Sequence, residues 1–146
     1  MNYRSYSSER TKKLGQSLAK KILSKGPGKG ARVVALSGDL GSGKTTFVQG
    51  FMRGLGLRGA KSPTFVIMRR SGLKKDTFKN VFHLDAYRLK DEKALSVLGF
   101  ADLTKEPENI IIVEWADIVR KALPRKSLKV AFKHGGKPNE RLIKIK

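Results

Sequence analysis

The chain has 146 residues, no cysteine, two histidines and a net charge of +20. The absence of cysteine excludes a disulfide framework and any thiolate metal site, and two histidines leave little for zinc. We expect one cytoplasmic domain over residues 1–146, because no apolar run is long enough to span a membrane and the first residues lack the apolar core of a signal peptide.

The first half of the chain alternates between helix and strand signals. Apolar residues at every fourth position predict a basic helix over residues 8–25, which "GPGKG" ends. "RVVALSG" is a short apolar run bounded by turn residues, which predicts a buried strand. A second amphipathic helix is expected from Gly43 onward, and Gly54 and Gly56 stop it.

The second half is predicted to contain mostly strands. "PTFVIMR" and "NVFHLDAY" are β-branched and aromatic runs joined by the polar turn "SGLKKDTFKN". "KDEKALSVLGF" and "ADIVRKALP" predict short helices, and "NIIIVEW" predicts a strand buried on both faces. "SLKVAF" and "RLIKIK" alternate apolar and basic residues, so residues 126–146 are expected to form basic, half-exposed antiparallel strands. Together these elements predict an α/β sandwich.

Sixteen of the twenty net positive charges lie in residues 1–30 and 120–146. Nucleic acid is a natural partner for such a surface. Simple solubility explains the charge equally well, because no aromatic residues alternate with the terminal lysines as base stacking would require. The charge by itself therefore decides nothing.

The stretch "SGDLGSGKTTF" matches the P-loop pattern, with Gly38, Gly43, Lys44 and Thr45 at the required spacing. Glycines let the backbone N–H groups surround phosphate oxygens, and the following helix adds positive potential. Lys44 is expected to reach the β- and γ-phosphates, and the Thr45 hydroxyl to complete a Mg²⁺ shell. Without a ligand, Lys44 is expected to project into solvent. The pattern predicts a nucleoside triphosphate with Mg²⁺, and the alternative is a glycine-rich helix cap.

Two predicted strands end in acids, Asp85 and Glu114. Ligands of such sheets lie at the strand ends, and a carboxylate beside buried aliphatic residues is costly unless it meets a cation. Both acids are therefore candidates to hold Mg²⁺ or to orient the nucleophile. The alternatives are a solvated strand end for Glu114 and a helix N-cap for Asp85. Asp39 is expected to bond a loop amide or a partner group.

The segments "GDLGSGKTTF", "KSPTFVI", "FHLDAYRL", "VLGF" and "IIIVEWAD" resemble the TsaE (YjeE) family in order and spacing, from about Thr11 to Arg141. That family consists of small bacterial P-loop ATPases that assist threonylcarbamoyladenosine modification of tRNA. The resemblance implies a P-loop NTPase-like three-layer α/β sandwich with a mixed, mainly parallel central sheet. It also implies an ATPase that works with TsaB and TsaD and resets their complex between turnovers. "EKAL" departs from the family's usual glutamate pair.

The resemblance also implies roles for individual residues. Asp85 is expected as the second acidic Mg²⁺ ligand, Glu114 as the Walker B-type acid, and Thr64 as a switch residue near Mg²⁺ or the γ-phosphate. The predicted catalytic residues are Glu114, Asp85 and Lys44. The predicted metal ligands are Thr45, Asp85 and Glu114. The predicted binders of ATP or ADP are Gly38, Asp39, Gly41, Ser42, Gly43, Lys44, Thr45, Thr46, Thr64 and Trp115.

Four further side chains lie beside these motifs. Tyr87 and Arg88 complete "HLDAYR" and are expected near the partner-facing side of the nucleotide. Arg88 could supply charge to the γ-phosphate or form an ordinary salt bridge. His83 is expected to be structural, and Trp115 could belong to the site or to the core.

Two other functions fit parts of the sequence. A small-molecule kinase uses the same loop, but the stretch from Arg70 to Asn80 is too short for both a lid and an acceptor-binding region. A basic nucleic-acid-binding module is motivated by the charged ends alone. We therefore predict a Mg²⁺-dependent ATPase, slow alone, that supports tRNA modification with TsaB and TsaD, could contact tRNA through its basic surface, and does not bind membranes.

Overall fold

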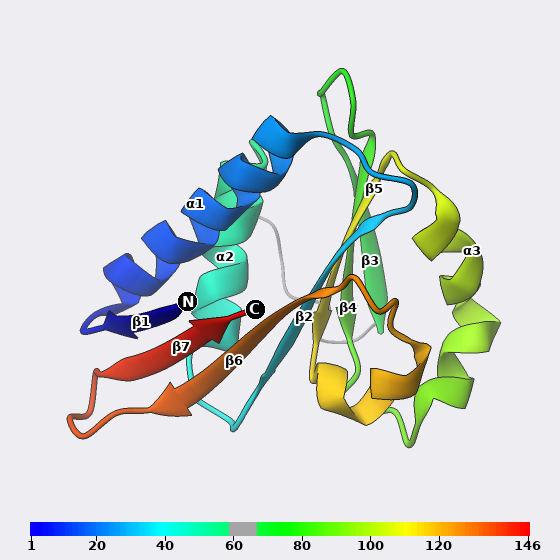
Figure 1. The fold of residues 1–146 in the computed structure, drawn as a ribbon. Coiled ribbons are helices and arrows are strands. Elements are labelled where there is room, and N and C mark those ends of the chain that lie inside the picture. Colours follow the sequence, from blue (N-terminus) through cyan, green and yellow to red (C-terminus); the bar gives the residue numbers. More distant parts are fainter. Residues whose placement is uncertain (59–66) are drawn as a thin grey trace.

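The computed structural model describes residues 1–58 and 67–146. In this part of the chain one mixed sheet has the strand order β1-β7-β6-β2-β5-β4-β3 (Figure 1). The strands are β1 (Asn2–Ser5), β2 (Arg32–Gly38), β3 (Met68–Gly72), β4 (Asn80–Asp85), β5 (Asn109–Glu114), β6 (Leu128–His134) and β7 (Arg141–Ile145). Strands β4, β5, β2 and β6 run parallel, whereas β3, β7 and β1 pair antiparallel with their neighbours. The predicted mixed α/β sheet is confirmed, with its parallel part at the centre.

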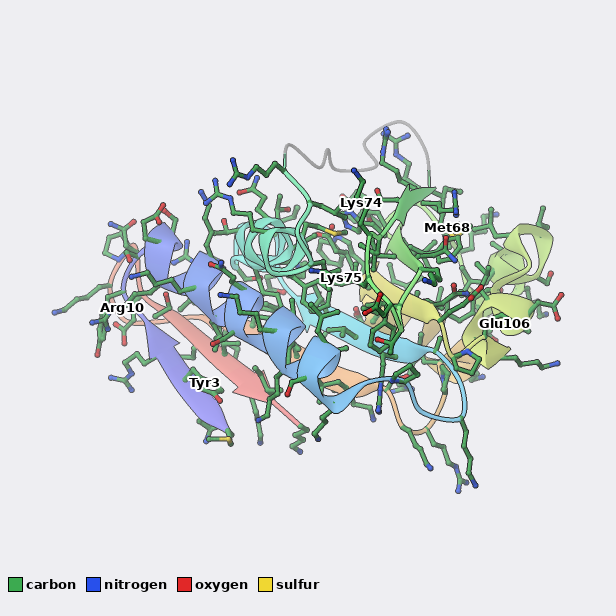
Figure 2. The ribbon with its side chains drawn as sticks, turned by 90° about the horizontal axis from the view of Figure 1, so that it is seen from above. Tyr3, Arg10, Met68, Lys74, Lys75 and Glu106 are labelled. Atoms are coloured by element: carbon green, nitrogen blue, oxygen red, sulfur yellow. The ribbon has the colours of Figure 1, made fainter. Side chains whose placement is uncertain are left out.

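Helices cover both faces of this sheet. The helices α1 (Ser8–Lys25) and α2 (Lys44–Gly54) lie on one face, and α3 (Phe100–Lys105) lies on the other with the 3-10 helices η1 (Glu92–Leu98) and η2 (Ala116–Ala122) (Figure 1). The edge strand β1, with Tyr3, and the end of α3, near Glu106, lie at opposite ends of the molecule (Figure 2). The predicted three-layer sandwich is therefore observed. None of the helices in the described residues is long and apolar enough to cross a membrane.

Strand β5 shows why a continuous aliphatic run is needed at the centre. Successive side chains of a strand point to opposite faces. Ile110 and Ile112 pack with α1 and α2, while Ile111 and Val113 pack against η1, η2 and α3. All four are fully buried, and burying each stabilises the fold by roughly 1.5–3 kcal/mol relative to exposure. By the same alternation, Glu114 at the end of β5 points to the side of α1 and α2.

The two long helices pack at very short range. A Cβ atom on Gly15 of α1 would lie 2.2 Å from the carbonyl oxygen of Phe47, and one on Gly50 of α2 would lie 1.9 Å from that of Lys12. Any larger residue at either position would therefore push the helices apart. This close packing holds the beginning of α1 beside the beginning of α2.

Several predicted elements differ from the structure. Strand β1 was not predicted, and β6 pairs parallel with β2, so the expectation of antiparallel pairing is wrong for that neighbour. The predicted turn from Ser71 to Asn80 contains the end of β3 and two buried apolar residues, Leu73 and Phe78. Most of the strand predicted from "PTFVIMR" lies outside the described residues.

Candidate functional site

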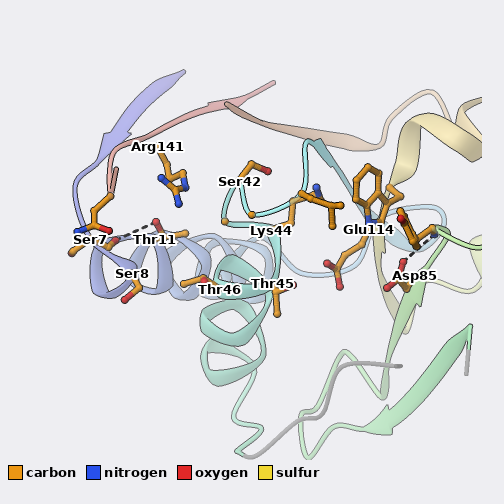
Figure 3. A pocket seen from close by; sticks show the side chains of 16 residues that line it. Ser7, Ser8, Thr11, Ser42, Lys44, Thr45, Thr46, Asp85, Glu114 and Arg141 are labelled. Atoms are coloured by element: carbon orange, nitrogen blue, oxygen red, sulfur yellow. Dashed lines mark hydrogen bonds between the residues drawn. The ribbon is translucent and has the colours of Figure 1, made fainter. Parts of the chain in front are cut away.

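A pocket of about 520 Å³ opens where the carboxyl ends of β4 and β5 meet the beginnings of α1 and α2 (Figure 3). Ligands of open α/β sheets bind at this edge of the sheet. The lining residues are Ser7, Ser8, Thr11, Leu40, Gly41, Ser42, Gly43, Lys44, Thr45, Thr46, Asp85, Tyr87, Glu114, Trp115, Asn139 and Arg141.

The loop between β2 and α2 needs its glycines. Gly38, Gly41 and Gly43 have φ values of 143°, 71° and 106°, a region in which other residues are strained. A Cβ atom on Gly38 would also lie 2.6 Å from the carbonyl oxygen of Phe132. The first hydrogen bond of α2 runs from the Phe47 N–H to the Gly43 carbonyl, so the preceding N–H groups of the helix have no acceptor within it. Those donors and the helix dipole favour an anion at this point.

Lys44 lies against the loop and does not project into solvent. The residue is 5% exposed, and its ammonium donates to the carbonyl oxygens of Gly38 and Asp39, the latter at 2.9 Å. The same nitrogen lies 3.9 Å from the centre of the Trp115 ring, a cation–π contact. Burial lowers the pKa of Lys44, and nearby carboxylates, Glu114 first, oppose that shift. The expectation of a solvent-exposed lysine is therefore wrong, because loop carbonyls and an aromatic ring hold it.

Glu114 is buried and paired. It is 4% exposed, and its Oε2 lies 2.6 Å from Nε2 of His83, which is itself 5% exposed. The alternative of a solvated strand end is therefore wrong. The pairing satisfies one carboxylate oxygen, and in Figure 3 the Glu114 carboxylate points into the pocket beside Lys44 and Thr45.

Asp85 and Trp115 form the wall next to Glu114. Asp85 Oδ1 accepts a hydrogen bond from the Tyr87 N–H at 3.0 Å, a local turn, while Asp91 caps the next helix; the N-cap alternative for Asp85 is therefore wrong. The ring of Trp115 packs on that of Tyr87 with centroids 5.0 Å apart. Trp115 has φ 57° and ψ 41°, an uncommon conformation for a bulky residue, and such strain gathers at functional sites.

Most of the residues predicted for the site come together in this pocket. Nine of them line it: Gly41, Ser42, Gly43, Lys44, Thr45, Thr46, Asp85, Glu114 and Trp115. Gly38 and Asp39 contribute through their carbonyls to Lys44, and the Asp39 side chain is exposed outside the lining. Arg88 is exposed and is not a lining residue. Thr64 lies outside the described residues.

The residues at the end of the pocket opposite Glu114 were not predicted from the sequence. Ser7, Ser8 and Thr11 from the start of α1 lie at the same end as Arg141 from β7 (Figure 3). Asn139 also lines the pocket. Ser7 caps α1 by accepting from the Arg10 N–H, a signal readable in the sequence. Its position beside the loop is not readable, because it depends on the pairing of β1 with β7.

The residues at the Glu114 end of the pocket have the chemistry to hold a magnesium-bound nucleoside phosphate. Magnesium prefers one or two carboxylates together with phosphate oxygens and water, and the pocket offers Asp85, Glu114 and the Thr45 hydroxyl. In the described part of the chain no three acidic or histidine side chains gather as a metal cage. In the described residues, the hydroxyl oxygen of Ser42 is buried in the loop without a hydrogen-bond partner, so this hydroxyl remains free to hydrogen-bond a ligand.

Comparison with known proteins shows to which family this chain is similar. The family model described as "Threonylcarbamoyl adenosine biosynthesis protein TsaE" matches residues 5–143. The protein named "tRNA threonylcarbamoyladenosine biosynthesis protein TsaE" from Bacillus subtilis is 39% identical over 105 residues, which cover 71% of this chain and 63% of that protein. The protein of the same name from Streptomyces coelicolor is 40% identical over 108 residues, which cover 73% and 67%.

A solved structure has a similar fold. The crystal structure of YdiB from Bacillus subtilis superposes with a TM-score of 0.77 at 30% identity and covers 99% of this chain and 83% of that one. The sequence alignments span less than two thirds of the relatives from Bacillus subtilis and Haemophilus influenzae, 63% and 61% of their lengths. By the family model and these relatives, the chain belongs to the TsaE family of threonylcarbamoyladenosine biosynthesis proteins.

Proposed function

We propose that this protein is a Mg²⁺-dependent ATPase that supports threonylcarbamoyladenosine modification of tRNA together with TsaB and TsaD. One observation carries the proposal. A glycine loop with a buried lysine, the Thr45 hydroxyl and two strand-end carboxylates line one pocket at the start of α2. This is the set of groups that P-loop ATPases use. Family membership supplies the pathway.

The loop and Lys44 bind the β- and γ-phosphates. The N–H groups at the start of α2 point to the anion, and the Lys44 ammonium exchanges its carbonyl acceptors for phosphate oxygens. Burial lowers the pKa of Lys44, whereas a bound phosphate favours its charged form, so phosphate binding and protonation of Lys44 support each other. Trp115 keeps the ammonium directed along the loop.

Thr45, Asp85 and Glu114 would hold the metal, directly or through water. When bound, Mg²⁺ neutralises charge on the phosphate oxygens. Because His83 engages Oε2 of Glu114, the other oxygen, Oε1, is left to orient the attacking water and accept its proton. The polar end formed by Ser7, Asn139 and Arg141 takes the nucleoside side of ATP.

The same geometry predicts slow hydrolysis by the protein alone. Fast P-loop hydrolysis needs a cation that meets the γ-phosphate charge, often supplied by a partner and worth roughly 10³–10⁵ in rate. Apart from Lys44, the only lining cation in the described residues is Arg141, at the far end of the pocket from Glu114 (Figure 3). A partner is therefore expected to supply the missing charge.

The test is phosphate release by the purified protein, then with TsaB, TsaD and tRNA added in turn, alongside mass analysis of the modified nucleoside. We expect slow release alone and at least a tenfold increase with partners, a small part of the roughly 10³–10⁵ range. Rapid release that partners leave unchanged would contradict the accessory role. Phosphate found on a metabolite would indicate a kinase, and tRNA binding without ATP affinity would indicate a nucleic-acid-binding module.

A further inference from the structure

The strands β6, β7 and β1 have one face that no helix covers in the described residues. Val130, Phe132 and Ile143 pack toward α1 and α2, and the alternate side chains point the other way. The core beneath η1, η2 and α3 contains no residue of these three strands, which extend away from those helices (Figure 1). We call this surface the open face; its outward residues are Asn2, Arg4, Lys129, Ala131, Lys133, Leu142, Lys144 and Lys146.

Strand register places five cations of the open face in one compact array. From β6 across β7 to β1, the aligned rows are Lys129–Lys146, Ala131–Lys144–Asn2 and Lys133–Leu142–Arg4. With strands about 4.8 Å apart and same-face residues roughly 7 Å apart, the array measures roughly 10 by 14 Å. All five cationic residues are exposed. A groove of about 450 Å³ over Ala131 and Leu142 is lined by three of them, Arg4, Lys133 and Lys144.

Almost no negative charge offsets this array. Glu140 is the only acid between residues 118 and 146. It is 7% exposed, and its Oε1 lies 3.3 Å from Nε of Arg4, whose side chain is still 59% exposed. Its Oε2 accepts from the Lys137 N–H at 3.3 Å, so the carboxylate is already engaged. Like charges on neighbouring strands repel each other, so an anionic partner on the open face would relieve that repulsion.

We propose that the open face binds the phosphate backbone of RNA. Lysine is a flexible point charge suited to phosphate oxygens. None of the eight outward residues is aromatic, and Tyr3, which borders the groove, packs against the core on the side of α1 and α2. The face therefore offers no platform for stacking splayed bases and is suited to the backbone. The choice of RNA as the polyanion rests on the proposed function in tRNA modification. Arg141 lies on the other side of β7 and lines the nucleotide pocket, so RNA on the open face leaves that pocket accessible.

The experiment measures binding of a fluorescein-labelled tRNA transcript by anisotropy over a series of salt concentrations. The test variant is the triple Lys129→Gln, Lys133→Gln, Lys144→Gln. The matched control neutralises three exposed lysines of α1, Lys13→Gln, Lys20→Gln and Lys21→Gln, and so has the same net charge.

For the open-face triple we expect at least a tenfold loss of affinity at low salt. The slope of log K against log salt should fall by about two to three, since each phosphate contact contributes about 0.7–0.9. The α1 triple should change the slope by less than one. Equal losses in the two triples, or a slope that does not change, would overturn the proposal.

Two further readouts separate the possible reasons for failure. Thermal unfolding and ADP affinity should be unchanged in both triples, because none of the six lysines lines the nucleotide pocket. If the open-face triple binds tRNA as well as the control does but loses the TsaB–TsaD complex, the face is a protein-docking surface and the RNA proposal is wrong. Wild-type protein without ATPase activity would contradict the proposed function and leave the tRNA measurement valid.

Discussion

The imidazole of His83 in β4 lies 2.6 Å from the carboxylate of Glu114 in β5. Both side chains are buried, on the face of the sheet that α1 and α2 cover. A carboxylate in this position is costly unless it is paired. The predicted structural histidine thus has a specific task, which is to hold the acid proposed to orient the attacking water. Different substitutions at His83 and Glu114 can therefore test the contribution of the pair to stability and its contribution to turnover separately.

Glu114→Gln should keep nucleotide binding and lose turnover. The amide retains the volume of the side chain and can hydrogen-bond His83, but it cannot accept a proton from water. Loss of a general base typically costs 10²–10⁴ in rate, so phosphate release should fall by at least about a hundredfold. Affinity for a fluorescent ADP analogue should remain within about threefold of wild type. Glu106→Gln, on an exposed acid, is the control; equal loss of binding and turnover in Glu114→Gln would make Glu114 a structural acid.

His83→Leu alone should destabilise the fold more than the replacement of both His83 and Glu114 by leucine. The substitution leaves Glu114 buried without its partner, which costs about 1–3 kcal/mol of unfolding free energy. The double variant His83→Leu, Glu114→Leu removes both polar groups and should recover part of that loss. Urea unfolding of the two single variants and the double variant gives the coupling energy. Additive effects would show that the pair does not contribute to stability as a unit.

Lys44→Met should abolish nucleotide binding without unfolding the protein. Methionine fills the space against Trp115 and removes a buried charge whose pKa is lowered by desolvation. The melting temperature should stay within a few degrees of wild type or rise. Lys44→Ala should bind equally poorly and melt lower, because it leaves a cavity beside the ring. ADP affinity near wild type in folded Lys44→Met would contradict the assignment of the loop.

The fold and one end of the site could be predicted because their signals are local. Four consecutive aliphatic residues predicted β5, and the spacing of the glycines and the lysine predicted the loop and the helix that follows it. The strand-end acids were found by the same local reasoning. The existence of β1 and the parallel pairing of β6 were not predicted, because both depend on distant partners. Strand β1 pairs with β7, more than a hundred residues later, and β6 pairs with β2, about ninety residues earlier.

The environment of Lys44 and the far end of the pocket could not be predicted, for a related reason. The position of Lys44 depends on the ring of Trp115, seventy-one residues later, and on loop carbonyls whose direction is set by positive φ angles. Arg141 reaches the pocket only because β7 pairs with both β6 and β1. Periodicity and spacing carry no information about such contacts between distant segments.

Gly38→Ala should damage the loop more than an alanine elsewhere in the sheet. Its Cβ atom would meet the Phe132 carbonyl at 2.6 Å, and φ of 143° is strained for any other residue. Such strain costs about 1–3 kcal/mol, and the Lys44 acceptor at this position would shift with the loop. We expect a lower melting temperature and at least tenfold weaker ADP binding. Gly72→Ala is the matched control, because a Cβ atom there meets nothing within 4 Å; similar behaviour of the two variants would refute the steric argument.

Arg141→Met should reveal which end of the nucleotide lies at the far end of the pocket. Arg141 donates to the carbonyls of Pro138 and Glu140, at 2.8 and 3.0 Å, which places its guanidinium across the pocket from Glu114 (Figure 3). If the nucleoside side of ATP binds there, calorimetry should show ADP affinity falling about tenfold, the value of one hydrogen bond to a charged group. Affinity for magnesium pyrophosphate should change by less than twofold.

A purely structural role for Arg141 predicts a different pattern. Distortion of the turn before β7 would weaken ADP and pyrophosphate together, because both depend on the same loop. The control is Arg125→Met, an exposed arginine outside the pocket lining, which should leave both affinities unchanged. The ratio of the ADP and pyrophosphate dissociation constants therefore decides the question independently of any change in stability. If both ligands bind more weakly and the ratio equals that of wild type, the nucleoside does not bind at Arg141.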